Sequence, residues 1–316
     1  MILISTGQRS KVFKDTFIFN TLSKKDKIFV VTDESNLDIY KFDNRNVELA
    51  PMNPETFLIF ENEEFESLID FSRTKLSKAF ARKLIKNPET FDVTEYFQNK
   101  NNFLHSTYGS YYFEPLRKKI KWIHSSLKRG NQALIGINIG EDEHATKKLP
   151  ISSIVELISK LRIKRGCKFV LFGTGKNNLI REDMILRQTS SFKNEVVTMV
   201  GLTDIKYLAQ AISLCDLFIS SNTFGLHLST AIGQKTIGIM ARVDDSESQI
   251  SENFHNLIKI KNRDNNCTEC NDEDECEMIE KSVGTCFNGV SIEQVAKMAN
   301  VYLNEPIKET KCQEAL

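Results

Sequence analysis

The feature that most constrains this fold is a regular alternation of short apolar runs and helical patterns from residue 133 onward. The apolar runs lie at 133–140, 168–173, 196–201, 216–221 and 235–240. Pro150 suits a first helical turn, and the apolar residues after it recur at the three-and-four spacing of one helical face as far as Gly166. Runs that are apolar on both faces are typical of parallel strands covered by helices. We therefore predict a doubly wound α/β domain in the C-terminal part.

The N-terminal part predicts a second, smaller α/β domain. Strand-like runs lie at 1–6, 27–32, 47–50 and 57–60, and the strongly charged stretch 61–100 has a helical pattern. We place the two domains at 1–128 and 129–316, and we expect two Rossmann-like domains that face a cleft.

Length and charge narrow the classes of function. The chain has 316 residues, enough for two domains, and 42 basic residues balance 42 acidic ones. Bulk charge therefore favours neither a nucleic acid nor an anionic membrane as partner. No apolar stretch approaches the roughly 18 residues that cross a bilayer, and the N-terminus lacks the apolar core of a signal peptide. We expect a cytoplasmic protein with no nucleic-acid partner and at most peripheral membrane contact.

The strand-to-helix junction at 220–233 is the first candidate binding element. In an open parallel sheet, ligands bind outside the carboxyl ends of the strands, here after residues 139, 173, 201, 221 and 240. The sequence SSNTFGLHLSTAIG passes directly from strand to helix, with Ser221, Asn222 or Thr223 as candidate caps. The N–H groups and dipole of such a helix start favour a diphosphate. The same residues also suit an ordinary helix cap.

Three neighbouring loops carry further candidates. Lys147 and Lys148 precede a helix and could neutralise a phosphate without a metal ion, or they form a solvated surface pair. Gly173 and Gly175 allow close approach of a ligand, but the third glycine of a dinucleotide fingerprint is missing, which argues against NAD. The turn at Gly201 either contacts a nucleotide or only precedes a helix.

These motifs resemble glycosyltransferase family 9, the lipopolysaccharide heptosyltransferases. The segments KKLP, FGTG, MVGLTD, NTFGLHLSTA and CTEC occur in the family's order between residue 133 and about 295. The resemblance implies a GT-B architecture and inverting transfer of a heptose-like sugar from a nucleoside diphosphate similar to ADP-heptose. It implies a glycan, lipid-linked saccharide or protein as acceptor, and no cofactor for the transfer itself.

The resemblance also implies roles for single residues. Lys147 would contact the donor phosphate, and the backbone at Thr223 and Phe224 would cradle the diphosphate. His227 resembles the motif histidine, although its place between two leucines also suits core packing. Asn222 replaces the family's Asp and Phe224 its Gly, so contacts to the sugar should differ. The predicted donor-binding set is Lys147, Lys148, Gly173, Gly175, Gly201, Asn222, Thr223, Phe224, Gly225 and His227.

The catalytic base is harder to assign. The family carries an Asp in the first strand-to-helix loop of the N-terminal domain, and Lys11 aligns with it. Asp15 is the candidate base beside Lys147 as the second catalytic residue, because inverting transfer needs one carboxylate within reach of the acceptor oxygen. Glu141 or Asp142 could serve instead. Two other functions stay open: an inactive relative that binds nucleotide sugars in a structural or assembly role, and a nucleotide-sugar epimerase.

A cysteine cluster near the C-terminus predicts a metal site. Four thiols follow a C-x2-C-x5-C-x9-C pattern, which suits structural Zn or Fe, and a metal would order the polar segment between them. The cluster resembles the iron-binding finger of autotransporter heptosyltransferases, a related group. The ligands would be Cys267, Cys270, Cys276 and Cys286. Two further thiols, Cys167 and Cys215, lie within apolar elements and are predicted to be core residues.

Overall fold

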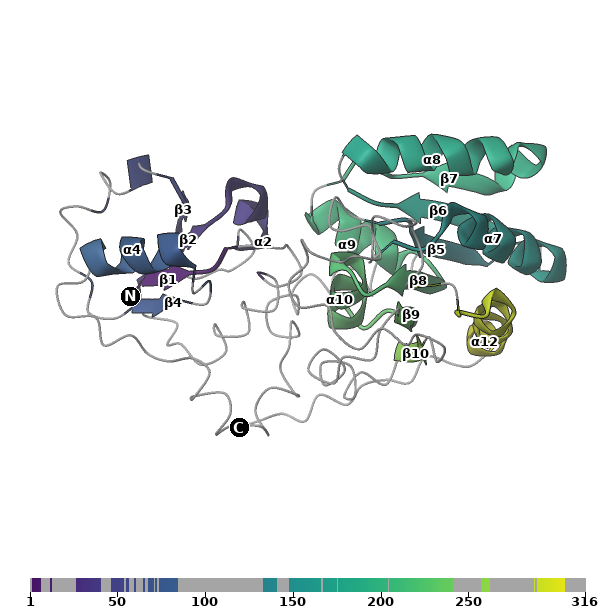
Figure 1. The fold of residues 1–316 in the computed structure, drawn as a ribbon. Coiled ribbons are helices and arrows are strands. Elements are labelled where there is room, and N and C mark those ends of the chain that lie inside the picture. The colour runs from purple at the N-terminus through teal and green to yellow at the C-terminus, as the bar shows by residue number, and fades with distance from the viewer. Residues whose placement is uncertain are drawn as a thin grey trace, which may run out of the picture. The chain divides into compact units, whose positions relative to one another are not determined.

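The chain consists of two compact α/β units, Met1–Glu114 and Pro115–Leu316 (Figure 1). The computed structural model describes residues 2–6, 12, 27–40, 47–53, 55–56, 60, 65, 68–70, 72, 74–84, 133–140, 148–165, 167–174, 176–203, 205–240, 257–261, 287 and 289–304. The domain boundary expected at residue 128 lies outside these residues. Each unit is described by itself below.

The N-terminal unit has a four-stranded parallel sheet in the order β3-β2-β1-β4. Its strands are β1 (Ile2–Ile4), β2 (Ile28–Thr32), β3 (Val47–Pro51) and β4 (Leu68–Asp70). Among the described residues, the helices with defined bounds are the 3-10 turn η2 (Glu34–Asn36), α2 (Leu37–Tyr40) and α4 (Lys75–Leu84). Beyond the carboxyl ends of β1 and β4, the Thr6 N–H donates to Ser72 Oγ at 2.7 Å. The parallel sheet confirms the expected class of this unit.

Helix α4 confirms part of the helical pattern expected at 61–100, but two details of the N-terminal unit differ from the expectation. Phe60, in the run expected as a strand at 57–60, is helical and buried. It packs edge-on against Phe29 and Phe65, with ring centroids 5.3 and 5.6 Å away. Strand β4 instead lies inside the stretch expected to be helical. Short apolar runs fit either a strand or a buried helix, and only pairing with β1 decides between them.

The C-terminal unit has a six-stranded parallel sheet in the order β10-β9-β8-β5-β6-β7. Its strands are β5 (Leu134–Asn138), β6 (Lys168–Phe172), β7 (Val196–Thr198), β8 (Leu217–Ser221), β9 (Thr236–Met240) and β10 (Leu257–Lys261). This is the strand order of a doubly wound Rossmann sheet, which confirms the fold class predicted from the sequence. Strand β10 was missed, because LIKIK alternates apolar and charged residues instead of forming one apolar run.

Helices cover both faces of the C-terminal sheet. They are α7 (Ile151–Arg165), α8 (Lys176–Gln188), α9 (Ile205–Ser213), α10 (Phe224–Ala231) and α12 (Ile292–Asn304), with the 3-10 segment η4 (Ser190–Glu195) before β7. Figure 1 shows α7 and α12 packed together on one side of the sheet and α9 and α10 on the other. Among the described residues, no helix is both long enough and apolar enough to cross a membrane.

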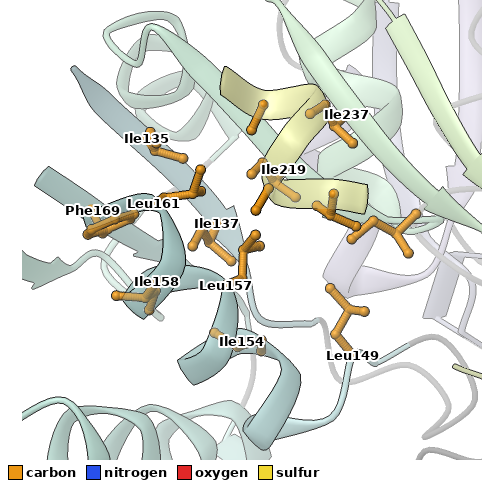
Figure 2. Close-up of a cluster of buried hydrophobic side chains, with 14 of the residues drawn as sticks. Ile135, Ile137, Leu149, Ile154, Leu157, Ile158, Leu161, Phe169, Ile219 and Ile237 are labelled. Atoms are coloured by element: carbon orange, nitrogen blue, oxygen red, sulfur yellow. The ribbon is translucent and has the colours of Figure 1, made fainter. Parts of the chain in front are cut away.

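The core under α7 fixes which face each residue of β5 occupies. Figure 2 shows Ile135 and Ile137 of β5 on the side of the sheet that α7 covers, with Ile137 beside Leu157, and all three are fully or almost fully buried. Successive side chains of a strand point to opposite faces, so Gly136 and Asn138 face the α9 and α10 layer. Other members of this core in Figure 2 are Leu149, Ile154, Ile158, Leu161, Phe169, Ile219 and Ile237.

Close packing on the opposite face leaves no room for a side chain at Gly136. A Cβ there would lie 2.8 Å from Phe218 and 2.9 Å from both Phe172 and Cys215. Cys215 and Cys167 are buried in this unit, which confirms their prediction as core residues.

Hydrogen bonds at the amino end of β5 fix its register against β8. The Leu134 N–H donates to Asp216 Oδ2 at 2.7 Å, and the Asp216 N–H donates to the Leu134 carbonyl at 2.7 Å. In the resulting register Ile137 pairs with Ile219. The next residues along the two strands are Asn138 and Ser220, which are thereby brought side by side.

Candidate functional site

The carboxyl ends of β5 and β8 form the candidate site. The chain runs outward from β5 through β6 to β7 on one side, and then returns to place β8 on the other side of β5. Such a reversal is a topological switch point, where the two flanking loops diverge and leave a crevice for a ligand. The loops at this point follow Asn138 and Ser221.

Asn138 ties the two loops together. Its Nδ2 donates to Thr223 Oγ1 at 2.8 Å and to Ser220 Oγ at 3.2 Å. Its Oδ1 accepts a hydrogen bond from the Gly140 N–H at 3.1 Å. The side chain is 3% exposed. Asn138 was not among the residues predicted from the sequence. The available signal was its polar side chain at the end of the otherwise apolar strand β5.

Thr223 caps helix α10 with its backbone and not with its side chain. It has extended backbone angles, with φ −129° and ψ 178°, and its carbonyl accepts from the Leu226 N–H at 3.1 Å. Its hydroxyl makes no capping bond and instead faces Asn138 and Ser220, the latter at 3.3 Å. The Thr223 side chain is therefore turned into the protein, where it holds the loops after β5 and β8 together.

Asn222 is the partly exposed residue of the turn. Between Leu217 and Ile232, where every residue is described, Asn222 is the only one that is not buried. His227 is 5% exposed and lies one turn into α10, and its N–H donates to the Thr223 carbonyl at 3.4 Å. Asn222 is thus the side chain of this turn that can reach a ligand.

The residues after Thr223 show why this chain has phenylalanine at 224 and glycine at 225. Phe224 is fully buried, so its side chain belongs to the core. A Cβ at Gly225 would lie 2.5 Å from Asn138 Nδ2, closer than real Cβ contacts allow. The tightly packed glycine is therefore Gly225, and its neighbour is the amide of Asn138.

Backbone hydrogen bonds join the loops after β5, β6 and β7 into one row. The Thr174 N–H donates to the Gly140 carbonyl at 3.3 Å, and the Gly201 N–H donates to the Gly173 carbonyl at 3.0 Å. A Cβ at Gly173 would lie 2.9 Å from the Gly140 carbonyl oxygen, so the close approach at Gly173 is to protein. Gly201 is exposed and has a φ of 69°, which favours glycine.

Two cations lie beside this row. The Lys148 side chain is 8% exposed, and its Cγ lies 3.0 Å from where a Cβ of Gly140 would be. Arg181 donates from Nε to the Ile139 carbonyl at 3.2 Å and from Nη2 to the Leu149 carbonyl. Arg181 thereby connects Ile139, just after β5, with Leu149, just before α7. Burial lowers the pKa of the Arg181 guanidinium, which remains protonated because arginine titrates far above neutral pH.

The remaining predicted residues lie outside the described residues. They are Lys11, Asp15, Glu141, Asp142, Lys147, Gly175, Cys267, Cys270, Cys276 and Cys286. Within the described part of the chain, no group of three or more His, Cys, Asp or Glu side chains could hold a metal ion. The base, the first lysine and the metal site therefore stay predictions.

The described part of the site is suited to an anion. The first turn of α10 contains no acidic residue, so its N-terminal partial charge is not neutralised within the helix. Lys148 and Arg181 add positive charge near the adjoining loop after β5. A phosphate group at a helix start gains from N–H donors and from the dipole together.

A family profile and a curated relative match parts of the chain. The profile of glycosyltransferase family 9 (heptosyltransferase) matches residues 74–279. Lipooligosaccharide heptosyltransferase 2 of Campylobacter jejuni subsp. jejuni serotype O:6 is 25% identical over 154 residues, which are 48% of this chain and 47% of that enzyme. The chain thus spans about half the length of this relative.

Two solved structures resemble nearly the whole chain. The glycosyl transferase family 9 structure from Veillonella parvula has a TM-score of 0.66 at 15% identity, covering 96% of both chains. E. coli ADP-heptose lps heptosyltransferase II has a TM-score of 0.65 at 13% identity, covering 96% of this chain and 98% of the other. At these identities the likeness establishes the fold, which is of the GT-B class.

Proposed function

Because the chain belongs to glycosyltransferase family 9, we propose that it transfers a heptose-like sugar from a nucleoside diphosphate to an acceptor hydroxyl, with inversion. ADP-heptose is the proposed donor, because the E. coli protein with the same fold is an ADP-heptose lps heptosyltransferase. The observation that carries the proposal is the junction of the β5 and β8 loops through Asn138 at the switch point. This junction lies beneath a helix start suited to a diphosphate.

Stabilisation of the departing diphosphate is the proposed role of the C-terminal unit. Negative charge builds up on the leaving group as the sugar bond breaks, so donors and cations aimed at it lower the barrier. We assign this role to the backbone at Thr223 and Phe224 and to Lys147 and Lys148. The partial exposure of Asn222 in an otherwise buried segment supports a contact between its side chain and the donor.

Buried residues of the predicted donor set act indirectly in this proposal. Gly173 packs against the neighbouring loop, Gly225 packs against Asn138, and His227 lies within the buried helix. We propose that these residues shape the donor site without touching the sugar. Gly201, which is exposed, and Gly175 stay proposed contacts to the nucleotide.

Deprotonation of the acceptor is the proposed role of Asp15 in the N-terminal unit. A carboxylate within hydrogen-bond reach of the attacking hydroxyl suffices for this step. The acceptor is a glycan, a lipid-linked saccharide or a protein. Asp15→Asn should abolish transfer while leaving donor binding intact, whereas full activity of this variant would move the role to Glu141 or Asp142.

Nucleotide release tests the proposed function. ADP-heptose is incubated with the chain and with a glycan, a lipid-linked saccharide or a protein acceptor, and ADP and the sugar products are followed by mass spectrometry. Acceptor-dependent ADP release with a glycosylated acceptor is the expected result. Binding of ADP-heptose in calorimetry without release from any acceptor would instead indicate an inactive binding protein. A changed sugar nucleotide without acceptor would indicate an epimerase.

A further inference from the structure

The carboxamide of Asn138 links the loops after β5 and β8 through its hydrogen bonds to Gly140 and Thr223. We propose that Asn138 is a positioning residue that sets the spacing of these two loops for the diphosphate of the donor. The proposal rests on the proposed function for the identity of the ligand. The geometry of the loops is a separate observation and can be tested separately.

The hydrogen bonds of the neighbouring residues determine which atom donates in each Asn138 contact. Ser220 Oγ donates its hydrogen to the Ser221 carbonyl at 2.8 Å, so it can only accept from Asn138. The two hydrogens of Asn138 Nδ2 then go to Ser220 and Thr223, while Oδ1 accepts from Gly140. This set of contacts needs two donors and an acceptor on one short side chain. Asparagine supplies them, and aspartate or leucine of similar size does not.

Burial indicates that Asn138 acts through its neighbours. Its side chain is 3% exposed, and Thr223, to which it donates, is 1% exposed. The Asn138 amide packs directly against Gly225, so α10 can begin this close to β5 because residue 225 has no side chain. The residue thus holds the start of α10 and the Gly140 turn in one arrangement without a surface of its own for the ligand.

Loss of this link should affect phosphate binding more than nucleoside binding. The phosphates would span the two loops, and a shift of about 1 Å in a binding element costs on the order of 10²-fold in rate. We expect Asn138→Ala to lower kcat/KM for ADP-heptose by about that factor and to weaken ADP binding by at least tenfold. Adenosine binding should change less than threefold. A general loosening of the domain would weaken ADP and adenosine alike.

Thr189→Val is the matched control. The Thr189 hydroxyl is also buried and donates to the Ile185 carbonyl at 2.9 Å. Thr189 lies just after α8, which runs back from the carboxyl edge of the sheet, so it lies at the opposite edge from the site. The Thr189→Val substitution should lower the melting temperature as Asn138→Ala does, and it should leave the ratio of ADP to adenosine affinity at the wild-type value.

A double-mutant cycle and hydrogen exchange complete the test. Thr223→Val removes one of the two acceptors of the Asn138 amide, the other being Ser220. The effect of Thr223→Val on ADP affinity should therefore not add fully to the effect of Asn138→Ala. Amide exchange in peptides covering 133–140 and 217–232 should rise together in Asn138→Ala and stay unchanged in Thr189→Val. Additive effects, or unchanged exchange at 217–232, would overturn the proposal. If the wild type binds no ADP, the proposed function fails, and the exchange measurement still decides whether Asn138 couples the loops.

Discussion

Substitution of Gly225 by alanine gives a sharp test of how β5 packs against α10. Gly225 is the second residue of α10, and its missing Cβ would lie 2.5 Å from Asn138 Nδ2 and 3.3 Å from Asn138 Cγ. Glycine in a helix is ordinarily less stable than alanine by up to about 1 kcal/mol. Without the contact to Asn138, the substitution should therefore stabilise the protein.

The magnitude follows from what must move. The Asn138 side chain is fixed by three hydrogen bonds, so relief of the contact requires either a shift of α10 or loss of these bonds. Overpacking of this kind costs about 1–3 kcal/mol, and each lost hydrogen bond costs about 1 kcal/mol. Against the helix gain, we expect a net destabilisation of about 2 kcal/mol. For a unit of this size that corresponds to a fall in Tm of roughly 4–8 °C.

Chemical denaturation and thermal melting of Gly225→Ala would measure this effect. The double variant Asn138→Ala with Gly225→Ala is the control, because removal of the amide makes room for the new methyl group. In that background Gly225→Ala should be neutral or stabilising. A Gly225→Ala single variant that is more stable than the wild type would refute the packing described here.

Four further outcomes follow from the same structure. Gly136→Ala should destabilise the protein by about 1–3 kcal/mol in urea unfolding, because its Cβ would lie under 3.0 Å from Phe218. Arg181→Met should destabilise the protein by about 1.5–3 kcal/mol for each hydrogen bond lost to a carbonyl. It should also lower kcat/KM, because Ile139 and Leu149 are no longer connected; unchanged kinetics would exclude a role in the site. Lys148→Met should lower ADP affinity, because the substitution removes the charge while an apolar stem stays beside Gly140. Equal affinity would remove Lys148 from the donor site. Elemental analysis should find one Zn or Fe per chain in the wild type and none in Cys270→Ser. A wild type without bound metal would contradict the proposed metal site.

The fold of the C-terminal unit was largely predictable because its strands are continuous apolar runs bounded by glycine or polar turns. The runs at 133–140, 168–173 and 216–221 correspond to β5, β6 and β8. The short strand β4 and the alternating strand β10 lack this signal. Their assignment depends on pairing with β1 and β9, which a local pattern does not contain.

The candidate site was predictable as a place but not as a set of contacts. The turn at Thr223 lies at the carboxyl edge of the sheet, as the strand-to-helix junction indicated. The inward direction of the Thr223 hydroxyl depends on Asn138, which lies 85 residues away in the sequence. The requirement for glycine at 225 and not at 224 comes from the same amide. Such long-range contacts are set by the strand order, so no local motif predicts them.

A crystal structure of the chain with ADP tests the central claim most directly. We predict that the diphosphate lies at the start of α10, with its oxygens within hydrogen-bond distance of the backbone between Asn222 and Gly225. Lys148 should lie on the side of the ligand where the diphosphate is bound. A nucleotide bound elsewhere, with the start of α10 unoccupied, would contradict the account.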